Sequence, residues 1–350
     1  MKGTRRAFTA IEAAFVIVLL VLLIGILIPA GGRSRGNTRQ MKDATQVRGI
    51  QQGLVTWTGN CQDNYPLPSL VDTPDTIPGI DTKSDPKLRD SKNIPRWELS
   101  LMLYQGIITP ELLVSPSEVN PAIQVNSTYE FANPTAVAAD KRSKAILDPS
   151  FAAYPDEPGG DTPIAGANGV APGAGCSYAF PALIGARRPV WASTFDGTQA
   201  VVANRGPWYS QDSKHNWSLN TTDRRGAKNI RATESNTLLI HGSRSTWEGN
   251  VARNDGSVNF ETRPDPENIP LFPGWTGSEQ HRSPHTRYDN LFANEDEESQ
   301  SSVYSSTDDD ITESTSSRRN NYLRCFGDRA TRRFDDKTGH LIALGNFWYD

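Results

Sequence analysis

The sequence predicts an α+β fold in which one long N-terminal helix packs on a mainly antiparallel, loop-rich β-sheet head. Two observations indicate this class: an apolar segment passes into an amphipathic helical pattern within the first sixty residues, and short segments rich in β-forming residues follow residue 175. The composition is the third, since 28 Gly, 24 Pro and only 36% hydrophobic residues do not suit a large buried parallel sheet. The 350 residues suffice for one large domain or two ordinary ones.

The charge and cysteine content exclude some function classes. With 36 Lys and Arg against 40 Asp and Glu, the formal net charge is −4, which gives no electrostatic reason to expect nucleic acid as a partner. No two cysteines form a CxxC pair, so the sequence indicates neither a zinc site nor a thioredoxin-type site. In an exported chain one disulfide could form, but all three thiols could equally be free, and the spacing does not select a pair among Cys61, Cys176 and Cys325.

A basic leader and an apolar segment begin the chain. Residues 1–7 (MKGTRRA) are basic, and residues 8–28 carry a single charge, that of Glu12. As a helix this apolar segment would be about 31 Å long, close to the thickness of a bilayer's hydrocarbon core. The pattern therefore predicts a transmembrane helix over residues 8–30. A carboxylate in such a span costs roughly 2.5–3.5 kcal/mol at the bilayer centre, so Glu12 needs an explanation.

Three explanations compete. A cleaved signal peptide fits poorly, because the apolar region is longer than usual and residues 28–30 (IPA) make a poor cleavage site. A plain anchor with an incidental Glu12 is the second. The third is a resemblance: residues 7–12 (AFTAIE) are similar to the processing site of type IV pilins and type II secretion pseudopilins.

This resemblance implies how the N-terminus is used. A prepilin peptidase would cut between Ala7 and Phe8 and methylate the new amine of Phe8. Glu12 then becomes the fifth residue of the mature chain and Pro29 the twenty-second, where many members of the family also have proline. In a bundle of such helices the amine of one copy can meet Glu12 of its neighbour, which sets the register between subunits because any other stagger leaves both charges unpaired. Ala7 departs from the family, which usually has Gly before the cut.

Residues 31–59 predict an amphipathic helix with an interrupted start. Gly31, Gly32 and Gly36 lie close together, and glycine is unfavourable in a helix. Apolar residues then recur every three or four positions and form one stripe for docking on the head: Met41, Ala44, Val47, Ile50, Leu54 and Trp57. Gly59 and Asn60 mark the end of the helix.

The head comprises residues 60–350. Residues 97–103 are predicted to form a short helix and residues 108–116 a helix–loop connection, and residues 155–175 form a Gly- and Pro-rich surface loop. Strands are predicted over 176–183, 189–195, 199–204, 236–241 (as a central strand) and 340–350 (as a closing strand). The segment NVARNDGSVNF predicts a hairpin over 250–260 with Asp255 and Gly256 at its turn.

A second resemblance involves this hairpin. Large bacterial pseudopilin-like proteins that carry a His-x9-Asp-Gly motif place a histidine ahead of Asp-Gly-x-Val-x-Phe. Here His241 precedes Asp255, Gly256, Val258 and Phe260, with thirteen residues rather than nine between His and Asp. Together the two resemblances cover about the first sixty residues and residues 176–260, and they imply a pilin-like fold.

An acidic run lies near the C-terminus. Between Glu295 and Glu313 the chain has eight acidic residues and no basic one, which predicts a solvated, disordered insertion over residues 294–317. The alternative is calcium binding by Asp308, Asp309 and Asp310, although no EF-hand spacing is present. No other cofactor or metal is indicated.

The function follows from the resemblances, because no phosphate loop, HExxH or GxSxG motif indicates an enzyme. They imply a structural subunit, anchored once in the inner membrane with its head in the periplasm or on a surface filament. Its N-terminal helix would assemble it into a type IV pilus-like or type II secretion filament. Its partners would be the prepilin peptidase, other pseudopilin subunits and the inner-membrane assembly platform. The alternative is a membrane-anchored envelope protein whose head binds an extracellular ligand and does not polymerise.

Overall fold

The computed structural model describes most of the chain. It covers residues 9–59, 61–155, 174–211, 216–221, 231–269, 288–295, 311, 313–326, 331–335, 337–345 and 347–348, without the side chains of residues 24–35, 211 and 331. The predicted loop at 155–175 lies almost wholly outside these residues, and so does most of the acidic run with Asp308, Asp309 and Asp310.

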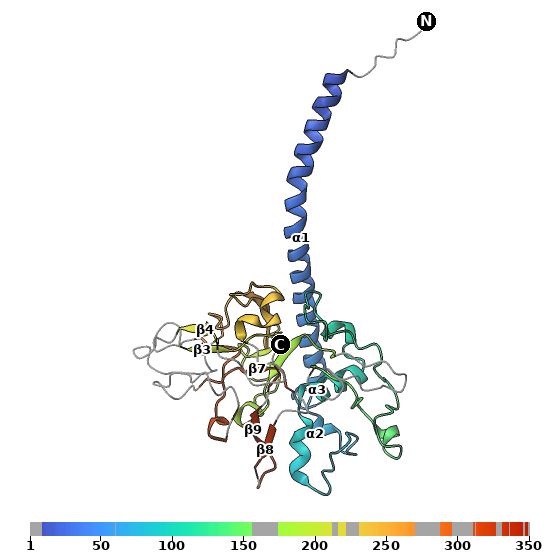
Figure 1. Cartoon of the computed structure of the whole chain (residues 1–350). Coiled ribbons are helices and arrows are strands. Elements are labelled where there is room, and N and C mark those ends of the chain that lie inside the picture. Colours follow the sequence, from blue (N-terminus) through green and yellow to red (C-terminus); the bar gives the residue numbers. More distant parts are fainter. Residues whose placement is uncertain are drawn as a thin grey trace.

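One long helix forms the N-terminal part of the chain. Helix α1 (Ala10–Thr58) is 49 residues long, and its N-terminal part stands clear of the head (Figure 1). It has no break at Gly31, Gly32 and Gly36, where the sequence predicted one. Each interior glycine costs a helix about 1 kcal/mol relative to alanine, which is not enough to break a helix that continues for several turns on both sides.

The C-terminal half of α1 packs on the head through the predicted apolar stripe. Val47, Ile50 and Leu54 are buried, and Trp57 is nearly so. Met41 is 68% exposed, so the docked face begins after it. The stripe is therefore confirmed as the side of α1 that meets the core, except at its first residue.

Two glycines allow this half of α1 to approach its neighbours closely. A Cβ atom at Gly53 would lie 2.8 Å from Cγ2 of Ile108 and 2.9 Å from Cε of Met102. One at Gly49 would lie 3.0 Å from Cδ1 of Leu112. These separations are shorter than packed carbon atoms normally reach, so a larger residue at either position would require α1 or these side chains to move.

Helix α1 lies on a five-stranded sheet in which every neighbouring pair is antiparallel, and this confirms the α+β class. Most of its contacts with the sheet are with β2, β5 and β6, which are neighbours in the strand order. In spatial order the strands are β6 (Val258–Glu261), β5 (Gly249–Arg253), β2 (Ala200–Asn204), β1 (Tyr178–Pro181) and β7 (Leu323–Arg324).

Two small hairpins and several short helices complete the described part of the head. The hairpins pair β3 (Tyr209–Gln211) with β4 (Trp217–Leu219), and β8 (Thr331–Phe334) with β9 (Leu341–Gly345). The helices are α2 (Pro68–Val71), α3 (Pro95–Tyr104) and the 3-10 helices η1 (Pro86–Lys92), η2 (Pro110–Leu113), η3 (Arg142–Lys144), η4 (Gly185–Arg187), η5 (Ala232–Glu234), η6 (Asn236–Leu239) and η9 (Glu313–Thr315).

Most of the predicted elements are present. Helix α3 covers the predicted helix at 97–103, and strands β1 and β2 lie within the segments predicted for them. Strand β9 occupies the predicted closing segment, although it pairs with β8 rather than with the main sheet. In the β5–β6 hairpin Asp255 and Gly256 form the predicted turn, and Gly256 has a φ of +83°, which favours glycine.

Two predicted strands are wrong. Residues 236–239 form η6 instead of a central strand, because Ser235 Oγ accepts a hydrogen bond from the N–H of Thr237 and starts a helical turn. Residues 189–195 form turns with one isolated bridge, between Ala192 and Asn64. Here the Trp191 indole donates to the carbonyl of Pro66 at 3.2 Å, so this segment is hydrogen-bonded to the loop that follows α1.

The predicted membrane placement is also wrong for the described part of the chain. No helix there has a stretch long and apolar enough to cross a bilayer. The exposed apolar side chains of α1 that are described near its N-terminus run from Ile11 to Leu23, which is about 20 Å of helix against roughly 30 Å of hydrocarbon core. A transmembrane helix over residues 8–30 and a single-pass location in the inner membrane are therefore not supported.

Candidate functional site

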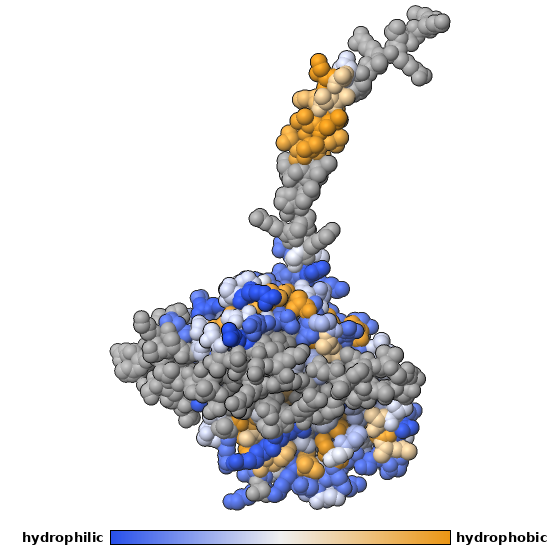
Figure 2. Space-filling model, viewed as in Figure 1, coloured by the Kyte–Doolittle hydropathy of each residue, from blue (hydrophilic) through white to orange (hydrophobic). Residues whose placement is uncertain are grey.

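Residues 9–23 of α1 form an apolar stem that projects from the head. Figure 2 shows this part of the helix covered mostly by hydrophobic side chains, whereas the coloured atoms of the head in the same view are more often hydrophilic. Every position from Phe15 to Leu23 is apolar, so these side chains surround the helix instead of forming one stripe. Ten large apolar side chains are between 44% and 82% exposed: Ile11, Phe15, Val16, Ile17, Val18, Leu19, Leu20, Val21, Leu22 and Leu23. A continuous exposed apolar surface of this kind marks an interaction site.

Glu12 has a local role that the sequence analysis missed. It forms a capping box with Thr9: the Thr9 N–H donates to Oε2 of Glu12 at 2.8 Å, and the Glu12 N–H donates to Oγ1 of Thr9 at 3.3 Å. The hydrogen bonds from the backbone and side chain of Thr9 lower the pKa of Glu12. The pattern Thr-x-x-Glu at residues 9–12 is the sequence signal for such a cap.

The other residues of the predicted processing and assembly motif are less fully described. Ala7 and Phe8 lie outside the described residues, and Pro29 lies within α1 without its side chain. The pairing of Glu12 with the amine of another copy therefore stays a prediction.

A second site lies where α1 enters the head, around the buried side chain of Asp43. Oδ1 of Asp43 accepts a hydrogen bond from the Tyr178 hydroxyl at 2.9 Å. Oδ2 accepts one from Nδ2 of Asn250 at 2.6 Å and lies 2.9 Å from Nε2 of His241. The partners come from β1, from β5 and from the segment after η6, so one carboxylate on α1 joins three separate parts of the head. We call these four residues the helix–head latch.

Electrostatics favours a charged carboxylate in the latch. Burial acts to raise the pKa of Asp43, but hydrogen bonds from His241, Ser115 and Asn250, together with the charge of His241, outweigh burial and lower it. Burial and the neighbouring Asp43 carboxylate raise the pKa of Tyr178 well above its usual range. At neutral pH Asp43 is therefore an anion, and Tyr178 is a neutral donor to it.

The three residues of the predicted family motif, His241, Asp255 and Gly256, lie in or near the latch. His241 contacts Asp43 and also packs edge-on against Phe260 of β6, with ring centroids 5.6 Å apart. Asp255 holds the hairpin turn by accepting a hydrogen bond from the Ser257 N–H at 2.8 Å. A Cβ atom at Gly256 would lie 3.9 Å from the side-chain amide of Gln51 on α1. All three motif residues thus lie on the segments that receive α1.

A buried acidic pair lies elsewhere in the head. Asp289 accepts hydrogen bonds from Nδ2 of Asn320 at 2.9 Å and from Nδ2 of Asn321 at 2.8 Å. Burial raises the pKa of Asp289 to about 8, against the effect of these hydrogen bonds. Burial and the charge of Asp289 raise the pKa of Glu295 well above its usual range. The pair therefore holds protons at neutral pH.

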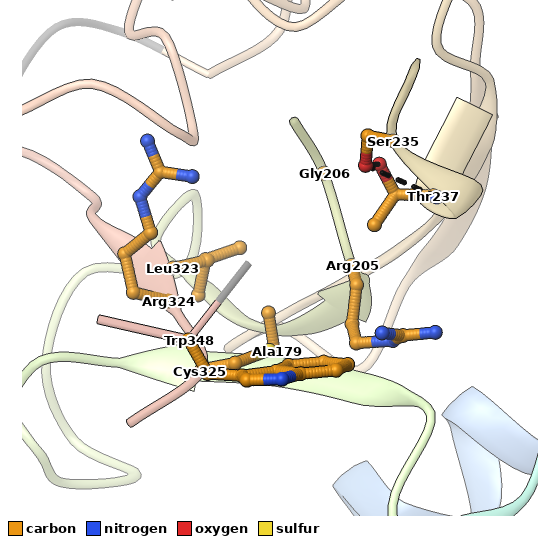
Figure 3. A pocket seen from close by; sticks show the side chains of 9 residues that line it. All are labelled: Ala179, Arg205, Gly206, Ser235, Thr237, Leu323, Arg324, Cys325 and Trp348. Atoms are coloured by element: carbon orange, nitrogen blue, oxygen red, sulfur yellow. Dashed lines mark hydrogen bonds between the residues drawn. The ribbon is translucent and has the colours of Figure 1, made fainter. Parts of the chain in front are cut away.

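The described residues offer no grouping of side chains for a metal ion. No three His, Cys, Asp or Glu side chains among them are placed to hold a metal ion. A cavity elsewhere in the head has a volume of about 10 Å³, and its lining includes Arg205, Arg324 and Trp348 (Figure 3). That volume is about the size of one water molecule. The Arg205 guanidinium lies 4.9 Å from the Trp348 ring centre. No disulfide joins any of the three cysteines, Cys61, Cys176 and Cys325.

No family model matches the chain, and no curated protein or solved structure is significantly similar to it.

Proposed function

We propose that the chain is a pilin-like structural subunit, cut before Phe8 by a prepilin peptidase and assembled through α1 into a filament of the type IV pilus or type II secretion kind. The observation that carries this proposal is the stem, which is apolar around its whole circumference and exposed. A helix with one apolar stripe needs one partner, whereas a helix that is apolar all round needs neighbours on every side. A bundle of stems from several copies meets that need.

The energy of stem burial is consistent with such a bundle. A large apolar side chain contributes roughly 1.5–3 kcal/mol when it passes from full exposure to full burial, so the stem's half-exposed side chains would contribute on the order of 10 kcal/mol. Association costs an estimated 4–15 kcal/mol in lost freedom of motion. One neighbour that covers a single face would recover only part of the burial energy, and several neighbours around the helix recover most of it.

The latch supports the same proposal. A filament that repeats regularly needs each head in the same position on its helix. Asp43 binds three separate parts of the head through buried hydrogen bonds, and a shift of α1 by one turn would leave those polar groups unpaired. The helix that would pack in the filament is thereby fixed to the head that would cover it.

The proposed partners follow from this role. They are the prepilin peptidase, further pseudopilin-like subunits and the platform that assembles them. In the second function considered above, the head binds an external ligand and the chain does not polymerise. That function provides no second copy of the chain to cover the stem.

A substitution at Glu12 tests the proposal, because it separates the helix cap from the charge. Glutamine at this position can still complete a capping box but carries no charge. Alanine can neither complete the capping box nor carry a charge. We expect Glu12→Gln to be cut normally by a coexpressed prepilin peptidase and to lose at least about tenfold in filament yield, since a neighbour's amine would meet no carboxylate. Filaments are measured by sedimentation and electron microscopy, and the cut by the mass of the N-terminal peptide.

The control is Lys42→Gln, a change of charge at an exposed position of α1 near the head, which should assemble like the parent chain. If Glu12→Gln assembles normally and Glu12→Ala does not, Glu12 acts as a cap alone. If the parent chain keeps Met1 and sediments as a monomer, the filament proposal is wrong.

A further inference from the structure

A groove on the head, separate from the stem and the latch, has the dimensions of a ligand site. Its volume is about 350 Å³, within the roughly 300–1,000 Å³ typical of small-molecule sites. Three separate segments form it: the β3–β4 hairpin, residues 245–247 before β5, and residues 262–265 after β6. The lining residues are Tyr209, Asn216, Trp217, Ser218, Leu219, Ser245, Thr246, Trp247, Thr262, Arg263, Pro264 and Asp265.

The lining is rich in uncharged hydrogen-bonding groups. Five of the residues carry hydroxyls, each of which can donate and accept, and Asn216 adds an amide with both functions. Ser245 and Thr246 are exposed, and Trp217 is partly exposed, so these groups are accessible from solvent. Such a set suits a ligand that presents several hydroxyls of its own together with an apolar face for an indole ring.

The charges in the groove argue against an anionic ligand. Arg263 is the one cation in the lining, and Asp265 binds it through two hydrogen bonds, from Nε at 2.9 Å and from Nη2 at 2.7 Å. Nη1 of Arg263 lies 3.5 Å from a carboxylate oxygen of Glu267. The positive charge is therefore offset within the site, so a phosphate or carboxylate would gain little attraction.

The guanidinium is nevertheless held in a fixed orientation. Asp265 is almost completely buried, with a side-chain exposure of 5%, and Arg263 is 35% exposed at the side of the groove. A planar group held by a buried carboxylate can direct its remaining N–H groups at a hydroxyl oxygen without being reoriented on binding.

We propose that this groove binds a neutral saccharide, with a sugar ring against Trp217 and its hydroxyls hydrogen-bonded by the groups of the three segments. This inference is independent of the filament proposal, because none of the lining residues belongs to α1.

Titration of the full chain with three neutral oligosaccharides, maltohexaose, cellohexaose and chitohexaose, tests the inference. Calorimetry gives the Kd, and saturation-transfer NMR identifies the sugar protons near aromatic rings. We expect at least one of the three to bind with a Kd on the order of 1 mM or tighter. Trp217→Ala should weaken that binding at least about tenfold, Trp217→Phe should weaken it less, and Ser245→Ala should weaken it measurably.

The control is Phe195→Ala, which removes a partly exposed aromatic ring outside the groove and should leave the Kd unchanged. Circular dichroism checks that each variant is folded. If no oligosaccharide binds saturably, or if Trp217→Ala and Ser245→Ala both bind like the parent chain, the inference is wrong. Tighter binding of inorganic polyphosphate than of any sugar, lost in Arg263→Gln, would also overturn it.

Discussion

At the scale of single residues, one buried carboxylate on the docked face of α1 binds the helix to three parts of the head. Asp43 lies four residues before Val47, and therefore on the same face of α1 as the docked stripe. Burial of a charge at that place would be strongly unfavourable without partners, and here three head residues supply them. The polar contact gives the docking a specific register, which the apolar contacts around it would not provide alone.

The first prediction concerns the coupling within the latch. We expect Asp43→Asn to lower the free energy of unfolding by roughly 3 kcal/mol, because the amide leaves its buried partners incompletely paired. His241→Gln should cost less in the Asp43→Asn chain than in the parent chain, with a coupling energy of roughly 1–2 kcal/mol. Urea unfolding of the parent, both single variants and the double variant measures this energy.

Lys42→Gln, next to Asp43 on the exposed side of α1, controls for the change of charge and should alter the free energy of unfolding by less than about 0.5 kcal/mol. An equal effect of His241→Gln in both backgrounds would mean that the two side chains are not energetically coupled.

At the scale of elements, glycines in α1 have two different roles. Gly36 has no other atom within 4 Å of a Cβ placed on it, whereas Gly53 would bring such an atom against Ile108 and Met102. In the free part of the helix glycine is only a weak helix former, and in the docked part it is the residue that fits.

The second prediction compares these two positions. Gly36→Ala should increase hydrogen-exchange protection of the neighbouring α1 amides by about fivefold, which corresponds to about 1 kcal/mol of helix propensity. Gly53→Ala should lower the free energy of unfolding of the whole chain by roughly 1–3 kcal/mol, because the added methyl group overfills the contact with α3 and residue 108. Each variant serves as the control for the other. If both substitutions stabilise the protein, or both destabilise it, the two glycines do not have the different roles assigned to them.

Elements that are specified by a few neighbouring residues could be predicted from the sequence. The β5–β6 hairpin follows from Asp-Gly between β-forming residues, and the docked half of α1 follows from its apolar period. The apolar run at 236–241 was assigned wrongly because a short run of this kind fits a strand and a helical turn equally well, and Ser235 decides in favour of the turn. The absence of a break at Gly36 could not be foreseen, because propensity is only a weak guide to helix continuity.

Only part of the latch could be predicted from the sequence. His241 was named through a motif, but its partner Asp43 is 198 residues away, and the other contacts of Asp43 span 135 and 207 residues. No local pattern records such separations. The available signal was an unexplained Asp on the apolar face of a predicted helix, which usually means a buried partner.

At the scale of the whole molecule, folding and the proposed assembly depend on different parts of α1. Its C-terminal half is packed into the head, whereas the stem makes an exposed surface that adds nothing to the core of a single copy. Substitutions in the stem should therefore change association without changing the unfolding of the head. Substitutions in the latch should change the unfolding of the head, measured at low protein concentration, without changing association.

The third prediction is that the head is most stable on the acidic side of neutral pH, because its buried carboxyl groups act in opposite directions. The folded-state pKa of Asp289, about 8, lies above its ordinary value of 3.8, so the folded chain keeps a proton that the unfolded chain releases as the pH rises. The stability that this group contributes is complete below about pH 4 and is lost as the pH rises to 8. The pKa of Asp43 is lowered, so its contribution is present above about pH 4 and is lost as the pH falls further and Asp43 is protonated.

Together these two effects predict that the free energy of unfolding is largest near pH 4. Above that pH it should decline by up to about 1 kcal/mol per pH unit toward pH 8. Urea unfolding of the parent chain and of Asp289→Asn, repeated from pH 3 to pH 8, measures the curve. Asp289→Asn should be flatter between about pH 5 and 8, because an amide releases no proton there, whereas Asp140→Asn, at an exposed position, should follow the parent curve. Parallel curves for the parent and Asp289→Asn would mean that Asp289 is ionised in the folded chain, which would contradict this prediction.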